Sequence, residues 1–144
     1  MTIAVVAIVI IAGLCVALQG QFIGSMTRSA GAPTSVVITY GAGAILAAIV
    51  WLTRGAPVHG VRQFPWYAWT SGVLGLVIVG GIGFATPRLG LSRTIIITIA
   101  AQLLAAILID HFGLFSAPQR AIDVWRALGF AVTIAGVWLV VRGS

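Results

Sequence analysis

The chain has 144 residues, of which 60% are hydrophobic and only 7% are Asp, Glu, Lys or Arg. Soluble domains use about 25% charged residues, so this composition excludes a water-soluble domain and predicts a protein whose surface faces lipid. The net charge of +6 comes from arginines that lie singly or in pairs beside apolar runs. That placement is typical of charges that orient membrane helices, so we expect the lipid bilayer as a partner and no nucleic acid.

Five apolar runs follow one another along the chain. A helix needs roughly 20 apolar residues to cross a hydrocarbon layer about 30 Å thick, and each run approaches that length. The second run begins at Pro33, a residue suited to the first turn of a helix, and the third opens with the aromatic residues Trp66, Tyr67 and Trp69. The runs cover residues 3–25, 33–53, 66–85, 94–109 and 124–141. The sequence therefore predicts an all-α membrane protein of about five transmembrane helices, forming a single transmembrane domain over residues 1–144.

The connections between these runs are short, so function is expected among the helices. The first loop is centred on Arg28 and Gly31, and a polar connection over residues 54–65 carries His59 and Arg62. The third connection covers residues 86–90. A final loop contains Pro118 and Arg120.

Small residues recur at close spacing within the runs. They allow two helix backbones to approach closely, which favours association where lipid removes the hydrophobic incentive. Chance matches are common, because glycine and alanine abound in membrane helices. The candidate packing positions are Gly20, Gly24, Gly72, Gly75 and Gly80. The glycine-rich third run is also suited to a helix that bends or slides.

The arginines are balanced between the two sides of the membrane. With five spans, one side would hold Arg54, Arg62, Arg120 and Arg126, and the other Arg28, Arg88, Arg93 and Arg142. The difference between these sums orients a membrane protein, and here it is zero. We expect insertion in both orientations and assembly of an antiparallel homodimer, the two-chain version of an inverted repeat. The alternative is an accidental balance, with helix hydrophobicity fixing one orientation.

Polar residues within the runs are the candidates for a binding site. An amide or hydroxyl is costly to bury in lipid, so it should face the protein interior or a wet cavity. Thr98 and Gln102 share one face of the fourth run with Thr94, and Gln19 lies toward the end of the first. In the second run Thr39 and Tyr40 are candidates. The predicted substrate-binding residues are Gln19, Tyr40, Thr98 and Gln102; the alternative is that they hydrogen-bond between helices or pack with satisfied hydroxyls.

The chain has two carboxylates: Asp110 directly follows the fourth run, and Asp123 directly precedes the fifth. One interpretation of Asp110 is ion or proton coupling, or substrate contact. The other is that Asp110 and His111 end the helix at headgroup level, paired with an arginine. His59 has no visible metal partners, and no nucleophile–base set or phosphate loop is present. We therefore expect no enzyme, no metal and no cofactor.

The region around the fourth run resembles a known family. Residues 101–103 (Ala-Gln-Leu) leading to residues 109–115 (Ile-Asp-His-Phe-Gly-Leu-Phe) are similar to the signature of the YdcZ-like bacterial inner-membrane proteins of the drug/metabolite transporter superfamily. Residues 65–69 and 87–90 are similar to the family's third-helix entry and exit. Gln19, Gly43, Arg126, Gly129 and Gly136 also fall where the family pattern places them. The resemblance covers nearly the whole chain.

The resemblance implies a multi-pass protein of the bacterial inner membrane, similar to the single-repeat, dual-topology members of that superfamily. Ile23 departs from the family pattern, which often has an asparagine there. The small multidrug exporters of the superfamily use a carboxylate in the first helix to couple protons to cationic drugs, and this first run has none. Export of lipophilic cations by that mechanism is not expected.

The function expected from these observations is transport of a small neutral or zwitterionic polar solute by an antiparallel homodimer with alternating access. A second hypothesis is a non-transporting subunit that assembles with another membrane protein; loss of its glutamines would then reduce assembly rather than flux. A small ion channel ranks last, because the sequence offers no ring of charged or carbonyl-rich residues of the kind that filters use.

Overall fold

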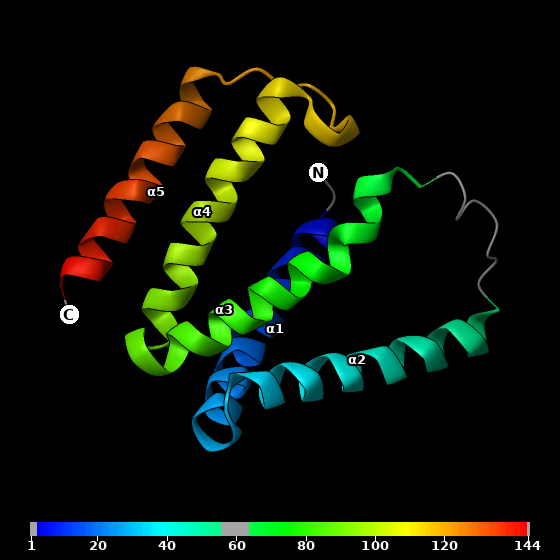
Figure 1. Cartoon of the computed structure of the whole chain (residues 1–144). Helices are drawn as coiled ribbons and strands as arrows, with labels where there is room; N and C mark the ends of the chain where they lie inside the picture. The colour runs from blue at the N-terminus through cyan, green and yellow to red at the C-terminus, as the bar shows by residue number, and fades with distance from the viewer. Residues whose placement is uncertain (1–2, 56–63, 144) are drawn as a thin grey trace. The chain divides into compact units, whose positions relative to one another are not determined.

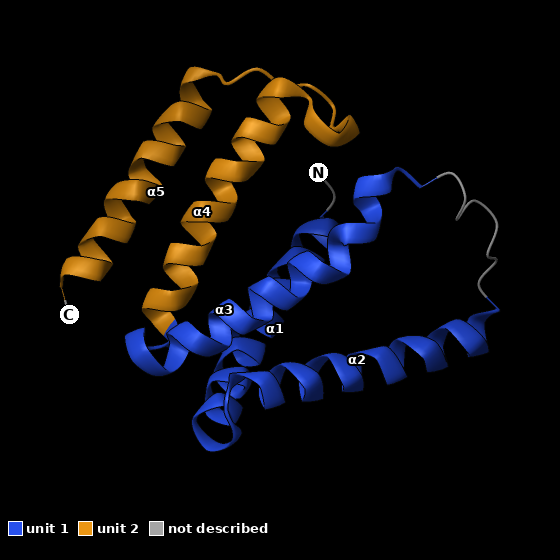
Figure 2. Cartoon of the chain, viewed as in Figure 1, with its two compact units in different colours: residues 1–91 blue, residues 92–144 orange. Residues whose placement is uncertain are grey.

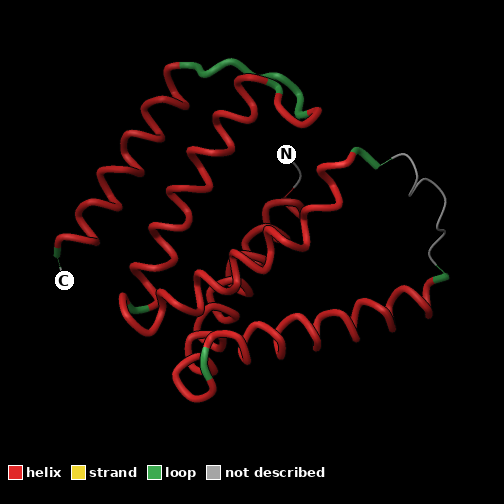
Figure 3. Tube along the Cα trace, viewed as in Figure 1, coloured by secondary structure: helices red, strands yellow, loops and turns green. Residues whose placement is uncertain are grey.

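A computed structural model describes residues 3–55 and 64–143, and every regular element in these segments is helical (Figures 1 and 3). The helices are α1 (Ile3–Ala30), α2 (Ala32–Arg54), α3 (Ser71–Leu89), α4 (Leu91–Phe112) and α5 (Val124–Arg142), with short 3-10 helices η2 (Trp66–Thr70) and η3 (Leu114–Ser116). Five segments of the described chain are long and apolar enough to cross a membrane, with η2 continuing into α3. The prediction of an all-α protein with five spans is confirmed, whereas the predicted homodimer stays a prediction. His59 and Arg62 lie outside the described residues.

Two predicted connections are wrong, because helix continues through them. Arg28 lies inside α1 and Pro87 lies inside α3, so one glycine at each junction replaces the expected loop. Gly31 and Gly90 have φ of 83° and 80°, a region that glycine adopts without steric cost, so a single residue can end one helix and begin the next. An arginine does not stop a helix at the membrane edge, because its long side chain can reach the interface.

The two glycine junctions have the same local structure. The amide of Gly31 donates to the Thr27 carbonyl at 3.0 Å, and the amide of Gly90 donates to the Thr86 carbonyl at 3.0 Å. Identical or similar residues recur at the same spacing around them, with a hydroxyl conserved where Ser35 corresponds to Thr94: Ile23, Gly24, Thr27, Gly31, Ser35 and Thr39 correspond to Ile82, Gly83, Thr86, Gly90, Thr94 and Thr98. The sequence therefore contains an internal repeat of a helix–glycine–helix unit, which the composition-based analysis missed.

The chain forms two compact units, Met1–Leu91 and Ser92–Ser144 (Figure 2). In the first unit α1 packs against both α2 and α3, most extensively against α3. Helices α1 and α3 run in the same direction (Figure 1). The prediction of one transmembrane domain stays a prediction.

The core of the first unit lies where the C-terminal parts of α1 and α3 meet. Ile23 is 2% exposed and Ser35 is fully buried. The Thr27 and Ser35 hydroxyls are 2.9 Å apart and share a hydrogen bond. A Cβ built on Gly83 would lie 2.9 Å from Ile23 Cγ2 and 3.0 Å from Thr27 Oγ1. Glycine is thus required here for close helix approach.

Most large apolar side chains of the chain are exposed. Ile3, Trp66 and Trp125 are among them, with 88%, 78% and 81% of their surface accessible. A soluble protein rarely exposes contiguous apolar surface on this scale. The surface is suited to lipid, and to other membrane helices, rather than to water.

Candidate functional site

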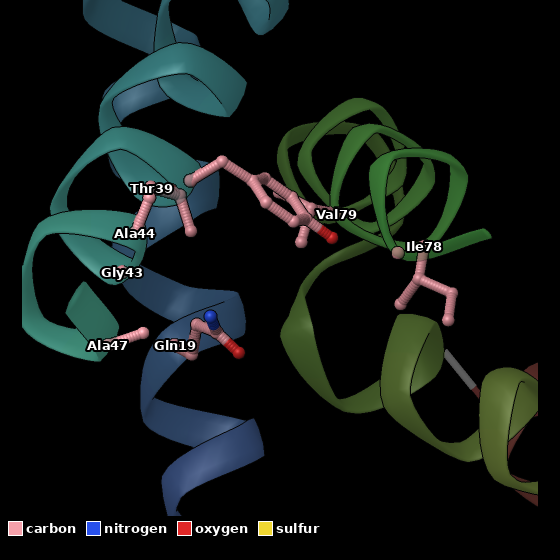
Figure 4. Close-up of a pocket in the computed structure, with 9 residues that line it drawn as sticks. Gln19, Thr39, Gly43, Ala44, Ala47, Ile78 and Val79 are labelled. Carbon is pink, nitrogen blue, oxygen red and sulfur yellow. The ribbon is translucent and has the colours of Figure 1, made fainter. Parts of the chain in front are cut away.

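A cavity of about 520 Å³ opens between α2 and α3, with one residue of α1 reaching it (Figure 4). Helices α2 and α3 are close where Gly83 approaches Ser35 and where Gly80 approaches Val36. From these contacts toward the C-terminus of α2 and the N-terminus of α3, small residues leave space between the two helices. The lining residues are Gln19, Thr39, Tyr40, Gly43, Ala44, Ala47, Gly75, Ile78 and Val79. We call this space the Gln19 cavity.

Three polar side chains line the Gln19 cavity. The Gln19 amide can donate and accept hydrogen bonds, as can the Tyr40 hydroxyl, and neither has a hydrogen-bond partner within the described part of the chain. The Thr39 hydroxyl donates to the Ser35 carbonyl at 2.8 Å, so it offers only an acceptor. None of the lining residues carries a charge. The cavity is therefore chemically suited to an uncharged solute that both donates and accepts hydrogen bonds.

Tyr40 owes its position to a glycine on the facing helix. A Cβ built on Gly75 would collide with the Tyr40 hydroxyl, so the phenol occupies the space that a side chain at position 75 would fill. Tyr40 is half-buried there. The pairing of Tyr40 with Gly75 could not be read from the sequence, because it depends on the register between α2 and α3.

The structure brings together two of the four predicted substrate-binding residues, Gln19 and Tyr40. Thr98 and Gln102 lie on α4, in the other compact unit, and line neither the Gln19 cavity nor a second cavity between α4 and α5. The Thr98 hydroxyl donates to the Thr94 carbonyl at 2.7 Å. The binding roles of all four residues stay predictions.

The candidate packing glycines have different surroundings. Gly20 and Gly24 are buried in α1, and a Cβ on Gly24 would lie 2.6 Å from Thr86 Cγ2. A Cβ on Gly80 would lie 3.9 Å from Val36 Cγ2, and one on Gly72 would meet no atom within 4 Å. Their roles in helix association stay predictions.

A second cavity, of about 420 Å³, lies between α4 and α5. Asp110 and Arg126 line it, with Asp110 Oδ2 lying 3.7 Å from Arg126 Nη1. The other lining residues are Leu103, Ala106, Ile107, Gly129, Phe130 and Thr133. We call this space the Asp110–Arg126 groove. The predicted arginine partner for Asp110 is thus Arg126, while a coupling role stays a prediction.

The α4–α5 connection folds back on the end of α4 and fixes this pair of charges. The amide of Arg120 donates to the Asp110 carbonyl at 2.7 Å, and the amide of Ile122 donates to His111 Nδ1 at 3.3 Å. Asp123 then caps α5 by accepting a hydrogen bond from the Arg126 amide at 2.7 Å, as expected of an aspartate at a helix N-terminus. A single sequence gives no direct signal for this return of the loop, although the Asp-x-x-Arg start of α5 indicates the cap.

Comparison with known proteins identifies the class to which these helices belong. The family described as "Putative inner membrane exporter, YdcZ" matches residues 4–139, so the chain belongs to this family, as its sequence predicted. The chain is a multi-pass protein of the inner membrane, in agreement with its five apolar helices. It is similar to the inner membrane protein YdcZ of Escherichia coli (strain K12), with 28% identity over 102 residues, 69% of this chain and 68% of that protein. No solved structure matches the chain.

Proposed function

We propose that the chain exports a small, neutral polar solute and that the Gln19 cavity binds it. The observation that carries the proposal is a cavity of about 520 Å³ with no charged lining residue, in which the Gln19 and Tyr40 side chains have no hydrogen-bond partner among the described residues. Cavities of roughly 300–1,000 Å³ hold small molecules in most proteins, with a few polar groups fixing orientation. The description of the family as inner membrane exporters supports efflux as the direction of transport.

The proposal includes an antiparallel homodimer that works by alternating access. Gln19 and the α2 residues Gly43, Ala44 and Ala47 are exposed in the single chain, so the cavity is open on one side and a second copy could close it. The equal arginine sums on the two sides of the membrane support opposite orientations of the two copies. Inverted copies would present the cavity alternately to each side by rocking about their shared axis.

The experiment is efflux from proteoliposomes loaded with a defined mixture of polyols, monosaccharides, neutral amides and zwitterionic amino acids, followed by mass spectrometry. The wild type should release a subset of the neutral solutes faster than protein-free vesicles. Gln19→Ala should slow that release by about tenfold, since one lost hydrogen bond in a binding site is worth roughly 1–1.5 kcal/mol.

The matched control is Gln21→Ala. Gln21 lies on the same helix and is exposed, but it does not line the cavity, so its efflux should equal that of the wild type. Selective release of amino acids alone would contradict the neutral-solute assignment. Equal loss in both variants together with reduced assembly on size exclusion would instead support a non-transporting subunit.

A further inference from the structure

The Asp110–Arg126 groove contains two opposite charges that do not satisfy each other. The Oδ2–Nη1 distance of 3.7 Å is too long for a hydrogen bond, and charge-assisted bonds between arginine and a carboxylate normally shorten to about 2.7–2.9 Å. The Arg126 side chain has 33% of its surface accessible, and the Asp110 side chain has 40%. Both groups can therefore accept a further partner without first breaking a hydrogen bond between them.

The two charges lie near the ends of membrane-spanning helices, where we expect lipid headgroups. Asp110 lies two residues before the end of α4 at Phe112, and Arg126 lies two residues after the start of α5 at Val124. Ends of membrane-spanning helices are located at the membrane–water interface, where charged and aromatic side chains gather. Trp125, beside Arg126, is 81% exposed, as expected of an interfacial residue.

Below the charges the groove is apolar. Ile107 and Leu103 follow Asp110 down α4, and Phe130 follows Arg126 down α5. The one hydroxyl on the lining, that of Thr133, donates to the Gly129 carbonyl at 2.9 Å. From Asp110 to Leu103 the helix rises about 10 Å, which is about two thirds of one leaflet of a hydrocarbon core about 30 Å thick.

We propose that the groove binds one zwitterionic phospholipid with a primary ammonium headgroup, such as phosphatidylethanolamine. The Arg126 guanidinium binds the phosphate, the Asp110 carboxylate accepts hydrogen bonds from the ammonium, and an acyl chain lies along Ile107, Leu103 and Phe130. Arginine matches phosphate geometry with two parallel donors. A small soluble zwitterion could reach the two charges, but it would leave the apolar part of the groove unfilled.

The test is native mass spectrometry of the full chain in detergent, incubated with equimolar phosphatidylethanolamine, phosphatidylcholine and phosphatidylglycerol of identical acyl chains. The wild type should retain phosphatidylethanolamine about tenfold over phosphatidylglycerol. Asp110→Asn should reduce this preference to near one while keeping phospholipid binding. Arg126→Gln should reduce binding of all three lipids.

Two further variants separate lipid binding from damage to the fold. Arg142→Gln removes the same charge from the opposite end of α5, where Arg142 lies over the Trp138 ring, and it should bind lipid as the wild type does. Gly129→Leu fills the groove without changing charge; a Cβ at Gly129 meets no atom within 4 Å, so the helix should form while lipid retention falls.

Three outcomes would overturn the proposal. Equal retention of the three lipids by the wild type would show that the charge pair selects none of them. Displacement of bound lipid by free leucine at equal concentration would assign the site to a soluble zwitterion. Conversion of the dimer to monomer by Gly129→Leu, with unchanged lipid retention per chain, would show that a second copy of the chain covers the groove. None of these readouts uses transport, so failure here is distinct from failure of the proposed export function.

Discussion

The hydroxyl-bearing side chains differ in whether their hydrogen-bond donor is available to a ligand. Several threonine hydroxyls are committed to carbonyls of the preceding helical turn: those of Thr39, Thr53, Thr98 and Thr133. Such a hydroxyl keeps its acceptor lone pairs but has used its donor. The Gln19 amide and the Tyr40 phenol are not committed in this way, so the donors of the Gln19 cavity come from these two residues. This assigns hydrogen-bond donation to Gln19 and Tyr40, and acceptance alone to Thr39.

The Tyr40 phenol gives a prediction at this scale. Gly75→Ala places a methyl group in the space of the Tyr40 hydroxyl, and because that hydroxyl is at the end of a rotatable side chain, the ring should swing away rather than the helices separate. Efflux should fall by about tenfold or more, since small misplacements of a binding group are costly, while the thermal midpoint in detergent should change little. Efflux from proteoliposomes checks the effect on transport, and a thermal melt in detergent checks the effect on stability.

Gly72→Ala is the control for this substitution. Gly72 lies one turn before Gly75 on α3, and its added Cβ meets no atom within 4 Å. Efflux of Gly72→Ala should equal that of the wild type. If Gly75→Ala behaved in the same way, Tyr40 would have no role in binding.

Among the elements, α1 and α3 form the contact on which the first unit depends. Gly24 of α1 lies against Thr86 of α3, and Thr86 is 3% exposed with a hydroxyl that has no hydrogen-bond partner among the described residues. Pro87 follows directly and has no amide hydrogen for the Gly83 carbonyl. The two helices therefore approach closely, while the buried Thr86 hydroxyl at their contact has no hydrogen-bond partner among the described residues. The stability of the contact rests on packing.

Gly24→Ala should consequently separate α1 from α3. The added Cβ would lie 2.6 Å from Thr86 Cγ2 and 3.0 Å from Thr86 Cβ, and overpacking of this kind costs about 1–3 kcal/mol. Thermal unfolding in detergent should show a lower midpoint. The double variant Gly24→Ala/Thr86→Ala should recover most of the loss, because it removes the clashing methyl group together with the unpartnered hydroxyl.

Gly13→Ala supplies the comparison on the same helix, since its added Cβ has open space. Its midpoint should equal or slightly exceed that of the wild type, as alanine favours helix over glycine. A midpoint as low as that of Gly24→Ala would attribute the effect to α1 alone and not to its contact with α3.

The sequence predicted those features of the helices that depend on patterns along a single segment. Apolar run length predicted five spans, and the start of α5 at Val124 agrees with the structure. The ends of α1 and α3 were placed too early, because Arg28 and Pro87 were interpreted as loop residues although both continue the helix. The contact of Tyr40 with Gly75 could not be predicted, since it depends on the register between two helices and not on any pattern along one.

For the whole molecule, the balanced arginines predict two orientations. Reporters for each side of the membrane, fused in turn to the C-terminus, should both give strong signals, because the positive charges favour neither side. Two arginines added at the C-terminus should reduce one signal and raise the other, which shows that the assay responds to charge.

Signal from only one of the two reporters in the unmodified chain would show a single orientation, and would contradict dual topology of this chain in the absence of a partner protein. An antiparallel partner would then have to be a different, oppositely oriented protein. The Gln19 cavity would keep its proposed role in that case, but it would be closed by an unlike surface instead of a second copy.

The internal repeat has a consequence for how such a chain can grow in evolution. Each repeated unit contributes two spans, α1 with α2 and α3 with α4, and two spans return a chain to the side of the membrane from which it started. Helix α5 is the span with no counterpart in the repeat, and it makes the number of described spans odd. Head-to-tail fusion of two five-span copies would therefore invert the second half in the membrane, whereas fusion of two copies lacking α5 would not. The unpaired last helix would let head-to-tail duplication reproduce the proposed antiparallel pair within one polypeptide.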